Sequence, residues 1–304
     1  SQINDLSTGN LQLLSNGAGI ELRKTDGEWM ANFATDGAVT LYYDNVAKLA
    51  TAAAGITIGT AGAAATLSTA SAGTSNLTLG VNAGNSIESG GNYNVAIGDE
   101  AGTAITTGDN NVAVGYAALD AVTTAVDLVA IGYNALGANT SGVRNTAIGS
   151  SALLTVTTNG TNTAVGYESL KLNTGYSNTA VGGYSLDTNS SGNYNTAMGD
   201  SALTANTTAS NNTAVGSSAA AAVTTGANNT AMGFSALLVD STGAENVAIG
   251  SYALDANTTA HYNVAVGKSA LGANTTGGYN VALGTNALDA NTTADSNVAL
   301  GYAA

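Results

Sequence analysis

The chain contains no cysteine, no proline and a single histidine, and charged residues make up only 9% of its 304 positions. Without cysteine, neither a disulfide nor a cysteine-ligated zinc site can form. His261 occupies a variable turn position, and one such residue gives no basis for a His-based catalytic triad or a His-rich metal site. We therefore interpret His261 as a solvated side chain.

Long apolar runs and positive charge are also missing. No apolar stretch reaches the roughly 18 residues that a membrane-spanning helix needs, and no basic-then-apolar leader opens the chain. The formal net charge is −14 with only six basic residues, which excludes nucleic acid as a natural partner because a polyanion would be repelled. The acids are spread along the chain, as on a solvated surface.

Hydrophobic residues nevertheless amount to 44%, and glycine occurs 39 times. This bias indicates a folded, repeated β architecture and argues against a disordered chain. A short motif, Asn-(Val/Thr)-Ala-(apolar)-Gly, recurs at steps of 17 residues, with one step of 18 and one of 16. Its glycines are Gly80, Gly98, Gly115, Gly132, Gly149, Gly166, Gly182, Gly199, Gly216, Gly233, Gly250, Gly267, Gly284 and Gly301.

Each 17-residue unit predicts one rung of an all-β, β-solenoid array over residues 75–304, with about 14 rungs. A leucine follows most motif glycines by four residues, with Ala220 replacing it once, and a polar turn such as Asn206-Thr207-Thr208 comes next. We expect two strands of about five residues and two turns in each unit, because the unit is too short for a helical crossover.

Stacking places equivalent residues in columns. The residue before each glycine is always apolar, so we expect that column to be the dry interior. The alanine column indicates either a close approach of backbones or filling of the other face of a thin rung. Asn stands before the strand in all copies but one, where Leu128 replaces it, which predicts a hydrogen-bonded ladder. The glycine column predicts a turn with positive φ.

Residues 1–74 have a different sequence pattern, without the 17-residue repeat. Short alternating segments near 11–14, 19–23, 28–33, 38–43 and 55–59 are separated by turn pairs at Asn16-Gly17, Asp26-Gly27 and Asp36-Gly37. We expect a β-rich shaft or cap that covers the N-terminal end of the solenoid. The other end stops at Ala304 part-way through a repeat, from which we expect that the natural protein continues.

Two resemblances follow from these residues. The segment 37–51, followed by Gly55-Ile56-Thr57-Ile58, resembles the shaft segments of tail fibres from marine bacteriophages, including cyanophages. The repeat over 76–304, for instance Asn-Thr-Ala-Val-Gly-Tyr-Glu-Ser-Leu at 162–170, is similar to phage fibre repeats and to the head repeats of trimeric autotransporter adhesins. Both families imply a homotrimer that binds surfaces. A thin rod also buries little apolar surface alone, which favours association of three chains.

The sequence gives little support for an enzymatic function. Asp120, Asp187, Asp255 and Asp289 occupy equivalent places just after the leucine, but a polysaccharide-cleaving site needs a close pair of acids, and tyrosines are scattered. The glycine pairs lack the context of a phosphate loop, and no loop has the calcium-repeat pattern. We expect no enzyme activity, no catalytic, cofactor-binding or metal-binding residues, and no cofactor.

The leading hypothesis is a structural fibre protein of a virion, a phage tail fibre that serves as a rigid homotrimeric spacer and attaches to the host surface. Its partners would be two further copies of itself, other tail or baseplate proteins, and a host surface glycan or protein, with neither nucleic acid nor membrane insertion. A bacterial trimeric surface adhesin is the alternative, with a cell-surface location. A polysaccharide-degrading tailspike is the third possibility.

Overall fold

A computed structural model describes residues 19–25, 27–34, 39–43, 46–52, 55–58 and 72–304. Every regular element within these ranges is a β-strand, which confirms the all-β class predicted from the sequence. The chain divides into two units, Ser1–Ser68 and Thr69–Ala304, which are described separately here. The expected boundary after residue 74 and the capping role of the first unit stay predictions.

The first unit contains a five-stranded antiparallel sheet in which consecutive strands pair, in the order β1-β2-β3-β4-β5. The strands are β1 (Gly19–Arg23), β2 (Trp29–Ala34), β3 (Val39–Tyr43), β4 (Val46–Ala52) and β5 (Gly55–Ile58). In the turn between β1 and β2, the Gly27 amide donates to the Lys24 carbonyl at 3.0 Å. The predicted segment 11–14 and the residues Asn16, Gly17, Asp26, Asp36 and Gly37 lie outside the described residues.

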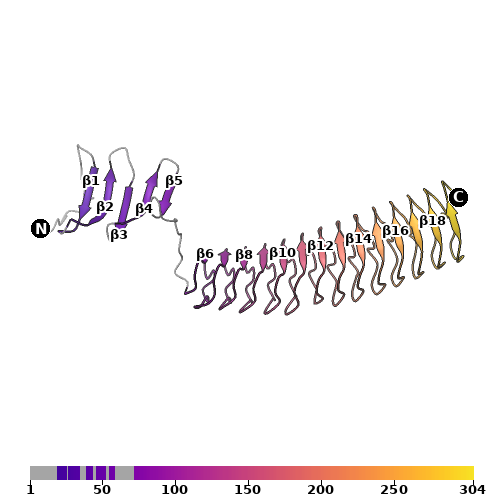
Figure 1. Ribbon diagram of the computed structural model, residues 1–304, viewed down its shortest axis with the longest axis horizontal. Helices are drawn as coiled ribbons and strands as arrows, with labels where there is room; N and C mark the ends of the chain where they lie inside the picture. Colours follow the sequence, from indigo (N-terminus) through magenta and orange to yellow (C-terminus); the bar gives the residue numbers. More distant parts are fainter. Residues whose placement is uncertain (1–18, 26, 35–38, 44–45, 53–54, 59–71) are drawn as a thin grey trace, which may run out of the picture. The chain divides into compact units, whose positions relative to one another are not determined.

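The second unit is a parallel β-solenoid, as predicted. Fourteen strands pair in sequence order, each with the next copy one turn along the chain, so they bound thirteen turns (Figure 1). Pairing is in register throughout, as in Ala147 opposite Ala164. The strands are β6 (Leu77–Leu79), β7 (Val95–Ile97), β8 (Val112–Val114), β9 (Val129–Ile131), β10 (Thr146–Ile148), β11 (Thr163–Val165), β12 (Thr179–Val181), β13 (Thr196–Met198), β14 (Thr213–Val215), β15 (Thr230–Met232), β16 (Val247–Ile249), β17 (Val264–Val266), β18 (Val281–Leu283) and β19 (Val298–Leu300).

The prediction of two five-residue strands per repeat is wrong, because each repeat has one strand of three residues. The opposite side of the rung is made of turns. Leu153, for example, adopts φ of +50°, which breaks the extended alternation, yet its amide still donates to the Ser169 carbonyl of the next rung at 3.1 Å. Backbone hydrogen bonds between rungs therefore continue on the turn side without a second strand.

The predicted interior of the strands is also wrong. In β10, Ala147 is fully buried, whereas Ile148 before the glycine is 37% exposed. A three-residue strand alternates out, in, out, so the residues on either side of the alanine both face outward. The alanine column is thus the inner one, and its small side chains let the two sides of the rung approach closely.

The solenoid core lies between the strand side and the turn side. The alanine column faces the leucines that follow each glycine by four residues, and these leucines are fully buried in the inner rungs: Leu119, Leu136, Leu153, Leu170, Leu186, Leu203, Leu237, Leu254 and Leu271. A small residue that precedes the leucine, such as Ala202, completes the layer. The leucine four residues after the motif glycine is therefore the main core residue of these rungs.

The predicted asparagine ladder is present, and its bonds run mainly from side chain to backbone. Asn212 is typical: its backbone amide donates to Oδ1 of Asn195 one rung earlier at 3.0 Å. Its own Oδ1 accepts from the amide of Asn229 at 2.8 Å, and its Nδ2 donates to the Gly226 carbonyl at 2.9 Å. Each buried side chain thereby holds the backbone of the next rung at two points, and its own backbone amide is held by the side chain of the rung before.

Candidate functional site

The outward face of the strand sheet is a continuous uncharged surface of the solenoid. Two columns form it, one on each side of the buried alanines, and we call them the outer strand columns. No charged residue occurs in either. They consist of Leu77, Val95, Val112, Val129, Thr146, Thr163, Thr179, Thr196, Thr213, Thr230, Val247, Val264, Val281 and Val298, and of Leu79, Ile97, Val114, Ile131, Ile148, Val165, Val181, Met198, Val215, Met232, Ile249, Val266, Leu283 and Leu300.

Aromatic side chains gather in pairs on the turn surface. Tyr116 and Tyr133 stack with ring centroids 5.6 Å apart, and further pairs are Tyr167 with Tyr184, Tyr176 with Tyr194, Phe234 with Tyr252, and Tyr262 with Tyr279. In the sequence these tyrosines look scattered. The rung register brings them together, because residues 16 to 18 positions apart become neighbours along the rod.

A shallow hollow of about 210 Å³ opens beside the last of these pairs. Tyr262 and Tyr279 form one wall with nearly parallel rings, 4.8 Å between centroids and 15° between planes. His261 and Asp295 line it two rungs apart, and Gly278 stands between them in the same column without a side chain. The predicted exposure of His261 is confirmed, and its Nδ1 accepts a hydrogen bond from the Ala244 amide at 2.9 Å.

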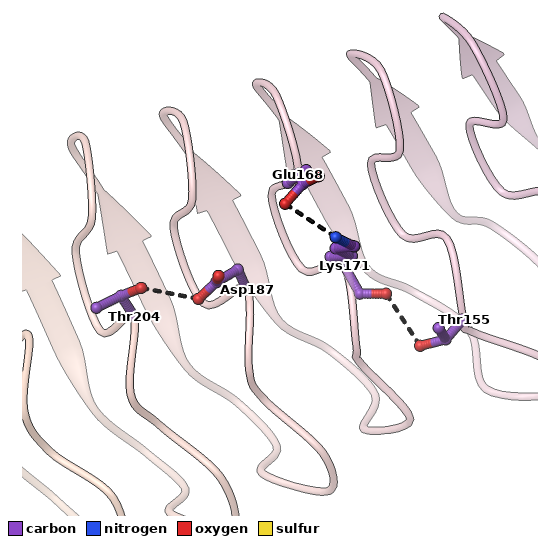
Figure 2. Close-up of polar contacts among 5 residues, drawn as sticks. All are labelled: Thr155, Glu168, Lys171, Asp187 and Thr204. Atoms are coloured by element: carbon purple, nitrogen blue, oxygen red, sulfur yellow. Dashed lines mark hydrogen bonds and ion pairs between the residues drawn. The ribbon is translucent and has the colours of Figure 1, made fainter.

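Polar contacts cross four successive rungs elsewhere on the turn side (Figure 2). Lys171 Nζ lies 3.0 Å from Glu168 Oε2, and the Lys171 carbonyl accepts from the Thr155 hydroxyl at 2.9 Å. The Thr204 hydroxyl donates to Asp187 Oδ1 at 2.7 Å. The hydrogen bond with Lys171 lowers the pKa of Glu168 and raises that of Lys171. The side chains of Lys171 and Glu168 remain partly exposed to solvent, at 33% and 18%, so we interpret these contacts as surface structure.

The four equivalent acids share a column but do not form adjacent pairs. Asp187 is flanked by Lys171 and Thr204 in the neighbouring rungs, and Asp255 and Asp289 are separated by Gly272. Partial burial raises the pKa of Asp255, and it also raises the pKa of Asp120 at the other end of the column. Within this column, no two acids stand in adjacent rungs as the close acid pair of glycoside cleavage would require.

A second ladder of buried side chains was missed in the sequence, where its residues look like ordinary polar turns. It comprises the residue seven positions after each motif glycine, which is buried in most rungs: Ile87, Ile105, Val122, Asn139, Val156, Asn173, Asn189, Asn206, Val223, Asp240, Asn257, Asn274 and the less buried Asn291. Asn206 Nδ2, for instance, donates to the Ala209 carbonyl at 3.1 Å and closes its own turn. The constant spacing from the glycine could have revealed this column.

Asp240 is the one acid in this second ladder. Its Oδ1 accepts from the Gly243 amide at 2.7 Å, and its Oδ2 lies 3.4 Å from Asn246 Nδ2. Burial raises the pKa of Asp240 to about 6, although these hydrogen bonds act in the opposite direction. The side chain therefore titrates close to neutral pH, inside the wall of the rod.

Within the described residues, no three acidic, histidine or cysteine side chains gather as a metal site would require. The same part of the chain contains no helix with the length and apolar character to cross a bilayer. Comparison of the chain with protein-family models, curated proteins and solved structures found no match. The surfaces described above are thus the basis for any functional proposal.

Proposed function

We propose that this chain is a structural fibre protein of a virion, a phage tail fibre in which the solenoid acts as a rigid homotrimeric spacer and helps to attach the particle to its host surface. The parallel solenoid suits a spacer, because each turn adds one strand spacing to its length. Other tail or baseplate proteins would hold the fibre on the virion. The resemblance of segments 37–51 and 76–304 to phage fibre sequences points to the same role.

The single observation that carries this proposal is the uncharged outer face of β6 to β19. At about 4.8 Å per rung, thirteen steps give a strip roughly 62 Å long. The first column is threonine from β10 to β15 and apolar elsewhere, and the second column is apolar throughout. A largely apolar strip of this length on a protein surface usually marks an interaction site. Met198 and Met232 on it are 46% and 42% exposed, so apolar surface remains available for burial against a partner.

Copies of the same chain are the partner that this strip fits best. All chains share one rung spacing, so side chains on two aligned strips remain in step along their whole length. The acidic residues that give the chain its charge of −14 lie outside the outer strand columns, so close approach of the strips does not bring them face to face. Three copies arranged around an axis would enclose all three strips and leave the turn surfaces exposed.

Light scattering on the purified full chain tests the assembly. We expect about three times the chain mass of 29.5 kDa, and a particle at the mass of one chain would contradict the homotrimer. Met198→Glu should dissociate the particle, because it places a charge within the strip. Ser217→Glu is the matched control, since Ser217 is exposed beyond the strand in a column that already holds Asp200.

Attachment is tested by incubating the labelled full chain with candidate host cells and measuring the cell-bound fraction. Binding that saturates, and that an excess of unlabelled chain displaces, would support the attachment role. A trimer that binds no cell type would restrict the proposal to a spacer. The virion location and the expectation that the chain is not an enzyme stay predictions.

A further inference from the structure

We propose that the hollow between His261 and Asp295 binds a single neutral pyranose ring of a glycan, with Tyr279 as the stacking platform. This inference rests on the proposed attachment to a host surface and names the chemical class that the surface would present. An exposed ring face, the missing side chain at Gly278 and the polar groups on either side of it support this assignment.

The aromatic wall leaves one ring face open. Tyr262 and Tyr279 cover one face of each other, and Tyr279 is 61% exposed. The next rung places Ser296 at the same column position, which is too small to cover the second face of Tyr279. The face of an aromatic ring carries partial negative charge and attracts the partly positive C–H groups of a sugar ring.

The polar groups beside the platform are oriented for hydroxyl groups. Because His261 Nδ1 accepts from the Ala244 amide, the ring proton of neutral histidine sits on Nε2, which can donate to a ligand. Asp295 Oδ1 accepts from the Gly278 amide at 2.7 Å, and the carboxylate retains capacity to accept from a hydroxyl. The two side chains lie two rungs, or about 9.6 Å, apart along the rod.

Gly278 creates the space between them. The same position one rung earlier carries the imidazole of His261, and one rung later the carboxylate of Asp295. At Gly278 an added Cβ would lie 3.1 Å from the His261 carbonyl and 4.0 Å from Asp295 Oδ1, so any larger side chain would occupy the hollow. The volume of about 210 Å³ is below that of sites for drug-sized ligands, which suits one ring.

The charge of the hollow selects against anionic ligands. Its lining contains Asp295 but neither lysine nor arginine, and the chain carries a net charge of −14. A uronic acid, a sulfated sugar or a nucleotide phosphate would therefore be repelled. A neutral ring avoids this cost, and a trimer would present three such hollows to a multivalent glycan.

The test is a binding titration of the full chain with maltohexaose, cellohexaose and laminarihexaose, followed by ligand-detected NMR, with polygalacturonate as the anionic comparison. We expect millimolar binding of at least one neutral hexaose, at least about tenfold weaker binding by Tyr279→Asn, and a similar loss for Gly278→Asn. Asn is compatible with the fold at each position, because Asn211 and Asn193 occupy the equivalent positions in two other rungs.

Tyr93→Asn is the matched control. Tyr93 belongs to the same column as Tyr279, has nearly the same positive φ and is 62% exposed, but its neighbours in that column, Ser75 and Asn110, offer no ring to stack on. Its substitution should leave binding unchanged. Equal binding by Tyr279→Asn and the unmodified chain, preference for polygalacturonate, or no binding of any neutral hexaose would overturn the proposal. Cell attachment that persists in Tyr279→Asn would overturn only this inference and leave the attachment role standing.

Discussion

The side-chain amide of Asn206 donates a 2.7 Å hydrogen bond to Oδ1 of Asn189 one rung earlier, while its own Oδ1 is buried and has no partner. The asymmetry has a simple cause. The equivalent residue of the next rung is Val223, which cannot donate, and the rung after that carries Asp240, which is an acceptor when ionised. Two consecutive substitutions in the second ladder therefore interrupt its chain of amides.

Asp240→Asn should stabilise the solenoid at neutral pH and reduce its pH dependence. The folded-state pKa of Asp240 is raised to about 6 from 3.8, so the folded chain binds the proton more tightly than the unfolded chain. The contribution of Asp240 to stability is therefore most favourable below pH 4 and falls as the pH rises to about 6. About two pKa units, at about 1.4 kcal/mol each, give a penalty of about 3 kcal/mol above pH 6. Thermal melting between pH 4 and pH 8 measures it.

Asp200→Asn is the control for this titration, because Asp200 is exposed on the turn surface. It should leave the shape of the pH profile unchanged. A profile of Asp240→Asn that runs parallel to that of the unmodified chain would show that Asp240 does not carry the effect.

Val223→Asn should be favourable only in combination with Asp240→Asn. The new Nδ2 would donate to Asn206 Oδ1 and relieve a buried unpaired acceptor, a gain of about 1–3 kcal/mol. Loss of the buried valine costs about 1.5–3 kcal/mol, and the new Oδ1 would face the Asp240 carboxylate. With Asn at both positions the ladder becomes continuous, so we expect a favourable coupling of about 1 kcal/mol in a double-mutant cycle measured by urea unfolding. Strict additivity would contradict this account.

The sequence was sufficient to predict the repeat, the solenoid and the first asparagine ladder, because each depends on the constant 17-residue step. Which side of the strand faces inward could not be read from hydropathy. Ile148 is more apolar than Ala147, yet the narrow rung has room only for the smaller side chain inside. The hydrophobic pattern therefore indicated the outer face of the sheet where we expected the core.

The hollow was hidden in the sequence for a different reason. Tyr262, Gly278 and Asp295 are ordinary turn residues when they are considered singly. Their relation depends on which residues become neighbours between rungs, and on the absence of a side chain at Gly278. An alignment of all repeats on the motif glycine, with adjacent rungs compared at every column, would have shown that Tyr262 and Tyr279 are neighbours.

A pair of substitutions in β13 tests the orientation of the strands. Ala197→Leu adds volume to a fully buried position and should destabilise the solenoid by about 1–3 kcal/mol. Met198→Leu keeps an apolar side chain of similar volume on the outer face and should cost less than about 1.5 kcal/mol. Urea unfolding followed by circular dichroism measures both. If Met198→Leu lost more unfolding free energy than Ala197→Leu, the residue facing the core would be Met198, and the strand orientation described here would be contradicted.

Gly166→Val should disrupt the turn that ends β11. Gly166 has φ of +138°, which side chains rarely adopt, and a Cβ there would lie 2.4 Å from the Gly182 carbonyl of the next rung, where backbone cannot move aside cheaply. We expect a loss of at least about 1–3 kcal/mol, seen as a lower melting temperature. Gly183→Ser is the matched control, because its Cβ would meet only the Asp200 side chain, and serine occupies the same position at Ser217. Equal melting temperatures for the two variants would mean that the glycine column is not required for the turn.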